Sequence, residues 1–186
     1  MQELTVTVNG RQHRAEVDER TLLLHFLRDE LGLTGTHNGC LEARCGCCAV
    51  LVNGQSVKSC NVLALQVDGA VIRTVENLAP ADGEAVPAWP GSEDGHGEAR
   101  LSALQETFRR HGAVQCGFCT PGMLIVATDF LQDHSEPNEE QAREAICGNL
   151  CRCTGYQKIV DAIVDAGKQR AAEISFEGAE TLSPGL

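Results

Sequence analysis

Apolar and polar residues alternate through the first segment of the chain, LTVTVNGRQHRAEV, on both sides of Asn9-Gly10. A period of two predicts strands with one buried face, and Asn-Gly is the strongest short-range hairpin signal. A second alternating segment, AVLVNGQSV, turns at Asn53-Gly54, and residues 71–75 (VIRTV) have the composition of a further strand. Two hairpins and one returning strand are therefore predicted within residues 1–78.

Between the two hairpins the period changes to that of a helix. Leu23, Phe26, Leu27 and Leu31 fall on one helical face over residues 21–31, and Gly32 follows as a stop signal. Hairpin, helix and returning strands together resemble the β-grasp arrangement of plant-type ferredoxins.

From residue 100 to residue 172 the apolar spacing is helical. Ser102 with Gln105 and Asn138 with Gln141 have the capping-box pattern that marks helix starts. A weak internal repeat, in which a helix, a cysteine pair and a second helix occur twice, predicts a four-helix bundle with both pairs at one end. The expected fold class is α+β, with a β-grasp ferredoxin-like domain (1–78) followed by an all-α domain (100–172).

Two segments show neither the strand period nor the helix period. Residues 79–99 are rich in Pro, Gly and acidic residues and are interpreted as a linker, and residues 173–186 as a C-terminal tail. The formal net charge of −11 disfavours nucleic acid and anionic membranes as partners. Because no segment is long and apolar enough to cross a bilayer, and no apolar export segment begins the chain, we expect a cytoplasmic protein.

The candidate chemistry lies in the cysteines. Eight of the ten fall into two sets of four. The first set has the spacing C-x4-C-x2-C-x11-C, and the second combines a C-x2-C with a C-x-C: Cys40, Cys45, Cys48 and Cys60; Cys116, Cys119, Cys151 and Cys153. A reducing cytoplasm disfavours stable disulfides, so these sets are interpreted as metal ligands.

The first set has the ligand spacing of plant-type [2Fe–2S] ferredoxins. Gly35, Gly39 and Gly46 let the loop backbone approach closely and turn N–H groups toward sulfur. Such donors are needed because an oxidised cluster with four thiolates carries a charge of about −2 and becomes more negative on reduction. The spacing therefore predicts an iron–sulfur cluster here.

The second set has two interpretations from spacing alone. Thr120 is expected as an N-cap and Pro121 as the first helical residue, which puts Cys119 just before a helix start, and Cys153-Thr154 is expected to repeat this geometry. Helix N-termini favour an anionic cluster. Zinc is the alternative, because four-thiolate zinc sites use C-x2-C knuckles, although a C-x-C pair is tight for one.

The combination GCLEARCGCCAVLVNG…KSC, QCGFCTPGM and GNLCRCTGY resembles the small iron–sulfur subunit of the molybdenum hydroxylases, over about residues 3–170. This resemblance implies one [2Fe–2S] cluster on each cysteine set. It also implies a large molybdopterin-binding partner and a medium FAD-binding partner, assembled as a dimer of heterotrimers. Electrons would pass from molybdenum through the second cluster and then the first to FAD. By the same resemblance, Gln115 contacts the pterin and Cys153 is the ligand nearest to it. A capping or core hydrogen bond is the other interpretation of Gln115.

Some residues depart from the family pattern. Leu41, Glu42, Ala43 and Arg44 stand where Gly-rich residues are common, and Arg44 either offsets cluster charge or points to solvent. Cys47 and Cys147 are thiols additional to the eight expected ligands. Both are interpreted as small buried residues.

The chain has no dinucleotide fingerprint and no phosphate loop, so we expect no catalytic residues of its own. Three functions are considered. The first is the electron-relay subunit of a molybdenum hydroxylase. The second is a freestanding two-cluster carrier or redox sensor. A zinc-stapled interaction module is a third. The substrate of the complex stays open among carbon monoxide, aldehydes, purines and other N-heterocycles.

Overall fold

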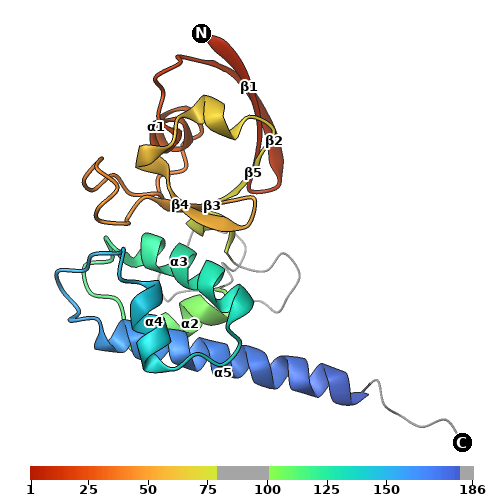
Figure 1. Cartoon of the computed structure of the whole chain (residues 1–186), viewed down its shortest axis with the longest axis vertical. Helices are drawn as coiled ribbons and strands as arrows, with labels where there is room; N and C mark the ends of the chain where they lie inside the picture. Colours follow the sequence, from red (N-terminus) through yellow and green to blue (C-terminus); the bar gives the residue numbers. More distant parts are fainter. Residues whose placement is uncertain (79–100, 181–186) are drawn as a thin grey trace, which may run out of the picture.

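The structure, a computed structural model, describes residues 1–78 and 101–180, with side chains described to residue 169. The segment interpreted as a linker (79–99) and the last six residues of the expected tail (181–186) lie outside the described residues. Figure 1 shows a strand-rich unit and a helical unit stacked on each other, so the fold is mixed α and β as expected.

The first unit is built on one five-stranded sheet of order β2-β1-β5-β3-β4. Strands β1 and β5 are parallel, and the other neighbouring pairs are antiparallel. The strands are β1 (Gln2–Val8), β2 (Arg11–Val17), β3 (Ala49–Val52), β4 (Gln55–Lys58) and β5 (Val71–Arg73). Both hairpins turn where expected, with positive φ at Asn9-Gly10 and at Asn53-Gly54.

A short helix covers this sheet. It begins as α1 (Leu23–His25) and continues as one π-helical segment, η1 (Phe26–Glu30), before Gly32 ends it at φ +70°. Leu23, Phe26 and Leu27 are fully buried and pack with apolar side chains of β1, β3 and β5. Three 3-10 segments complete the unit: η2 (Ser59–Asn61), η3 (Ala64–Val67) and η4 (Val75–Asn77).

The second unit has four helices: α2 (Ala103–Arg110), α3 (Thr120–Asp133), α4 (Glu139–Ala145) and α5 (Gln157–Glu180). Both predicted capping boxes are present. The Gln105 amide donates to Ser102 Oγ at 3.2 Å, and the Gln141 amide donates to Asn138 Oδ1 at 2.9 Å. Helix α5 continues to Glu180, into the range interpreted as the tail.

Two expected helix starts are wrong. The N-cap of α3 is Cys119, not Thr120, because the Cys119 carbonyl already accepts the first helical bond from the Met123 amide at 3.0 Å. Helix α5 begins only at Gln157, after Tyr156 with φ +70°, so Cys153 does not directly precede a helix. Thus only the first cysteine pair of this unit lies at a helix N-terminus.

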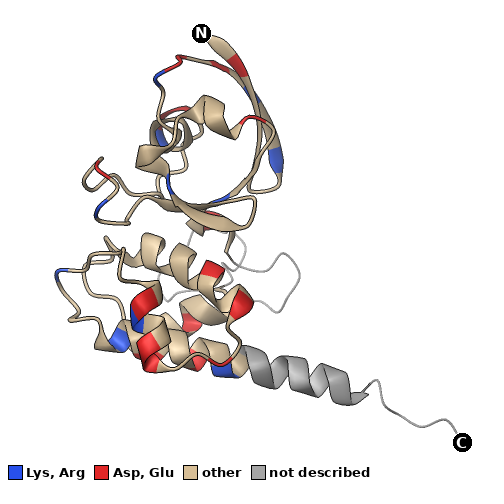
Figure 2. Ribbon diagram, viewed as in Figure 1, with Lys and Arg blue, Asp and Glu red and all other residues tan. Residues whose placement is uncertain are grey.

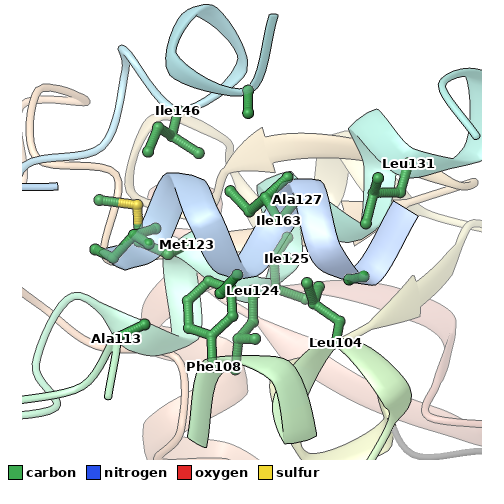
Figure 3. Close-up of a cluster of buried hydrophobic side chains, with 14 of the residues drawn as sticks. Leu104, Phe108, Ala113, Met123, Leu124, Ile125, Ala127, Leu131, Ile146 and Ile163 are labelled. Atoms are coloured by element: carbon green, nitrogen blue, oxygen red, sulfur yellow. The ribbon is translucent and has the colours of Figure 1, made fainter. Parts of the chain in front are cut away.

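The helical unit has an apolar core in which α3 and α5 face α2 (Figure 3). Phe108, Met123 and Ile163 are essentially inaccessible to solvent. The same buried cluster includes Ala49 and Leu51 of β3, so the core of the helical unit extends to one face of this strand, while Val50 of β3 belongs to the separate core of the sheet unit. Removing this much apolar surface from water is the main stabilisation available to the contact between them.

Helix α3 lies directly against the sheet unit. A Cβ on Gly122 would stand 2.2 Å from the Gly46 carbonyl oxygen, so only glycine permits this approach. Farther along α3, Asp129 accepts a hydrogen bond from the Ser56 amide at 2.8 Å, and Gln132 donates to the Gly54 carbonyl at 3.1 Å. The contact therefore runs along most of the helix.

Figure 2 shows carboxylates on both units, and in the second unit most of them lie on the helices. Within the described ranges, none of the helices has the length and apolar character needed to cross a bilayer.

We predict that Gly122→Ala lowers the free energy of unfolding by roughly 1–3 kcal/mol, because the added methyl group overlaps the Gly46 carbonyl. Glycine to alanine within a helix otherwise stabilises by about 1 kcal/mol, so a loss would identify the steric contact. Chemical denaturation measures this change in the free energy of unfolding. Gly148→Ala is the control, since its Cβ would meet only the flexible end of Lys58, at 3.4 Å. A stabilised Gly122→Ala protein would contradict the close approach.

Candidate metal centres

The first cysteine set occupies the loop that leads into β3, together with η2. Cys48 and Cys60 are buried, at 2% and 5% exposure, while Cys40 and Cys45 are half-buried in the loop. A Cβ on Gly39 would lie only 2.8 Å from the Cys45 sulfur, so glycine is required where the loop closes on the thiols. The sequence expectation that glycine allows this approach is confirmed at Gly39.

Backbone N–H groups of this loop point at sulfur. The amides of Glu42 and Cys45 donate to Cys40 Sγ, and the amide of Ala43 donates to Cys60 Sγ, each at 3.4 Å. Leu41 and Ala43 both adopt φ +56°, where left-handed backbone favours glycine. This loop therefore adopts left-handed backbone at two residues that are less suited to it than glycine.

The loop lowers the pKa of one thiol, Cys40, and raises the pKa of another, Cys48. Amide donation, first from Cys45 and then from Glu42, lowers the pKa of Cys40 to about 7. Burial raises the pKa of Cys48 to about 11. A metal bound here would displace the Cys48 proton, and this coupling makes the affinity of thiolate sites depend on pH.

The second set is assembled from two loops. Cys116 lies between α2 and α3, and Cys119 caps α3. Cys151 and Cys153 lie between α4 and α5. The sulfur atoms of Cys116 and Cys153 are 3.5 Å apart, so the two pairs meet at one end of the helices, as the internal repeat predicted. Cys116 and Cys153 are exposed, whereas Cys119 is buried.

Thr154 is the principal donor to the second set. Its hydroxyl donates to Cys151 Sγ at 3.0 Å and its amide at 3.4 Å. Burial raises the pKa of Cys151, but the hydrogen bonds from Thr154, the Cys153 amide and the Cys119 side chain together lower it below its ordinary value. Cys119 lacks such a side-chain donor, and burial raises its pKa to about 12.

Both sets fit a group held by four thiolates. Their donor atoms are sulfur alone, and N–H or O–H groups face Cys40, Cys60 and Cys151. In the part of the chain that the structure describes, no three His, Cys, Asp or Glu side chains form a site for a single metal ion. The fit therefore rests on the thiols and on the donors around them.

The two sets are joined by direct hydrogen bonds across the interface between the units. The amide of Leu150 donates to the Cys45 carbonyl at 2.9 Å, and Asn149 donates to the Gly46 carbonyl at 3.3 Å. His37 stacks on Phe118, with ring centroids 4.8 Å apart, and its Nδ1 lies 2.8 Å from the Phe118 carbonyl oxygen. Both ligand loops are thus held by the same contact.

Comparison with known proteins identifies both units. Residues 6–78 match the 2Fe-2S iron-sulfur cluster binding domain, and residues 92–164 match the [2Fe-2S] binding domain. The chain is 46% identical over 167 residues to the nicotine 6-hydroxylase small subunit of Paenarthrobacter nicotinovorans, covering 90% of each chain. It is also 46% identical over 165 residues to caffeine dehydrogenase subunit gamma of Pseudomonas sp. (strain CBB1), covering 86% and 87%.

The structure of quinoline 2-oxidoreductase from Pseudomonas putida 86 aligns with a TM-score of 0.79 at 40% identity, covering 92% of this chain and 96% of that chain. The chain belongs to the small iron–sulfur subunits of the molybdenum hydroxylases. It has two [2Fe–2S] domains, and the resemblance read from its motifs is confirmed. Such a subunit transfers electrons within an oxidoreductase complex.

Three residues that depart from the family pattern can now be placed. Cys47 is buried at 4% exposure, as expected. Cys147 is exposed in the turn after α4, so its interpretation as a buried residue is wrong. Of the two roles considered for Arg44, the structure favours solvent: its side chain is 80% exposed and pairs with Glu42 at 3.5 Å.

Gln115 is exposed beside the exposed Cys116, and its side chain has no hydrogen bond with the residues that the structure describes. A capping or core role for Gln115 therefore has no support here, and its amide is accessible to a group outside this chain.

Sequence reasoning missed the residues that connect the two sets. Asn149 and Leu150 stand inside the quoted motif GNLCRCTGY, but their partners Gly46 and Cys45 lie in the other unit, far away in sequence, and spacing does not encode that contact. The one sequence signal for these contacts was the run of polar and small residues around Cys151, which does not have the apolar spacing of a helix.

We predict that Thr154→Val raises the pKa of Cys151 in the iron-free subunit, because the hydroxyl that stabilises the thiolate is lost. Less thiolate at pH 7 should slow alkylation of Cys151 by roughly tenfold, a factor that corresponds to one hydrogen bond to a charged group. Mass spectrometry of iodoacetamide-treated protein measures the rate, with folding checked by circular dichroism. Thr154→Ser should keep the original rate. Equal rates in all three proteins would refute the donor role.

Proposed function

We propose that this chain binds one [2Fe–2S] cluster on Cys40, Cys45, Cys48 and Cys60 and a second on Cys116, Cys119, Cys151 and Cys153. In this proposal the chain relays electrons between a molybdopterin-bearing subunit and a flavin-bearing subunit. Each cluster supplies a one-electron acceptor and donor. The remaining requirements, which are position, charge stabilisation and exclusion of water, fall to the protein.

The observation that carries the proposal is the hydrogen bond between the Leu150 amide and the Cys45 carbonyl, 2.9 Å long. Cys45 is a proposed ligand in the first set, and Leu150 directly precedes Cys151 of the second set. One hydrogen bond therefore completes a bonded path from the sulfur of Cys45 to the sulfur of Cys151. Such a short path suits electron transfer between two centres inside one chain.

The open side of the second set supports the direction of transfer. Cys116 and Cys153 are exposed, and Gln115 beside them is free to donate or accept a hydrogen bond. We infer that this face meets the pterin, with Cys153 as the nearest ligand. The first set would then lie on the side of the flavin.

Exposed apolar residues around the thiols favour permanent docking over a freestanding carrier. Leu41 and Phe118 are each 46% exposed, and Leu150 is 56% exposed; each is adjacent to a proposed ligand. Apolar side chains concentrated around the thiols indicate a surface that a partner covers. A large and a medium partner subunit follow from family membership, and we propose that they assemble with this chain as a dimer of heterotrimers in the cytoplasm.

The finer fold assignment is also a proposal. The sheet order β2-β1-β5-β3-β4 with one covering helix supports a β-grasp domain over residues 1–78. Helices α2 to α5 support a four-helix bundle over residues 100–172.

The relatives favour one substrate class for the complex. Nicotine, caffeine and quinoline, which stand in the names of the three similar proteins, all contain a nitrogen heterocycle. We therefore propose that the complex hydroxylates an N-heteroaromatic compound, in preference to an aldehyde or carbon monoxide.

The first test is purification of the native protein under mild conditions. We expect a brown complex in which this chain stays with molybdenum- and flavin-bearing chains and which reduces a dye with N-heterocycles faster than with aldehydes. Brown protein recovered alone would support the freestanding carrier. Colourless protein containing zinc would support the interaction module and refute the cluster proposal.

The second test addresses the ligands. Cys48→Ser should abolish one of two electron paramagnetic resonance signals and stop flavin reduction, because Cys48 is a buried proposed ligand. Cys147→Ser is the matched control, since Cys147 is exposed and outside both sets. It should leave about four irons per chain, as two [2Fe–2S] clusters require. Two intact signals in Cys48→Ser would exclude the proposed first ligand set.

A further inference from the structure

One cation lies between the two ligand loops. Lys58 is the last residue of β4, two positions before Cys60, and its side chain is half-buried. Its Nζ donates to the Ala43 carbonyl at 2.8 Å, within the loop that holds Cys40 and Cys45.

The same ammonium group is near the loop of the second set. Nζ stands 3.4 Å from the point where a Cβ on Gly148 would lie, and Gly148 lies in the turn after α4, three residues before Cys151. Lys58 therefore reaches from the sheet unit to the helical unit and contacts the backbone of the first ligand loop on the way.

Lys58 differs from the other cation of the first loop in how its charge is balanced. The ion pairs among the described residues include Arg44 with Glu42, at 3.5 Å, and none includes Lys58. Arg44 is 80% exposed, so water and Glu42 both reduce its field. Lys58 is held by a neutral carbonyl in a half-buried position, where its charge is less screened.

The position of this charge matters for a centre that becomes more negative on reduction. A nearby cation stabilises the more negative state, so it raises the reduction potential, and reduced solvent screening strengthens that effect. Because Lys58 donates to the loop between Cys40 and Cys45, its field acts mainly on the first set.

We propose that Lys58 is a positioning residue that raises the reduction potential of the cluster on the first set and so favours electron transfer from the second cluster to the first. The hydrogen bond to Ala43 fixes the ammonium group beside the first loop, and the missing side chain at Gly148 leaves room for it beside the second loop. This role rests on the proposed function, and it assigns to Lys58 the charge compensation that the sequence suggested for Arg44.

The test uses the intact complex and a redox titration followed by electron paramagnetic resonance. Lys58→Met should lower the midpoint potential of one cluster only. The equilibrium constant for transfer between the clusters should fall about tenfold, which corresponds to ~59 mV for a one-electron couple. Lys58→Arg, which keeps the charge, should retain most of the original potential.

Arg44→Gln removes one positive charge from the same loop at an exposed position. Its effect should be smaller and should vanish in high salt, whereas the effect of Lys58→Met should persist. Lys58→Gln keeps a polar side chain without the charge and should behave like Lys58→Met. It also replaces Lys58→Met as the test if the methionine variant fails to fold.

An unchanged potential in folded Lys58→Met or Lys58→Gln would overturn this inference, as would equal shifts for Lys58→Met and Arg44→Gln. A potential lowered as much by Lys58→Arg as by Lys58→Met would also overturn it, because charge would not be the cause. These results differ from failure of the proposed function, in which the unmodified complex would lack two distinguishable cluster signals.

Discussion

Thiolates concentrate negative charge inside a small protein, and the rest of this structure meets that constraint. Two ferric ions, two sulfides and four thiolates together carry a net charge of about −2, and such a group is stable away from water only where donors surround it. The first loop supplies amides by holding Leu41 and Ala43 in left-handed backbone. The second supplies the hydroxyl and amide of Thr154 and the N-terminus of α3. The same requirement is met by two different local structures.

Close packing of the two units holds the two cysteine sets in a fixed position relative to each other. The absence of a side chain at Gly122 lets α3 touch the Gly46 carbonyl, and the same approach brings Leu150 within hydrogen-bonding distance of Cys45. Ala49 and Leu51 of the sheet belong to the apolar cluster of the helices, so separating the units would expose apolar side chains of both. The spacing of the electron-transfer centres is therefore set by apolar packing as much as by the ligands.

Sequence predicted the features that depend on neighbours along the chain. The Asn-Gly turns, the capping boxes and the cysteine spacing are local codes, and the structure reproduces the first two where they were expected. The exceptions depend on three-dimensional surroundings. Cys147 looked like any small apolar residue but lies in an exposed turn, and the first helical bond of α3 is accepted one residue earlier than Thr120 suggested. Lys58 carries no motif, and only the folded chain reveals that it lies between the two loops.

The bond from Leu150 to Cys45 also bears on how such a subunit can change over evolutionary time. Each half contains a complete set of four cysteines, so the halves look exchangeable between relatives. Yet Gly122 and Asn149 in one half both contact Gly46 in the other. A chimera that joins halves from different ancestors would have mismatched surfaces at the interface around Gly46. We therefore expect the two halves to be inherited together, and a substitution on one side of their interface to require a matching substitution on the other.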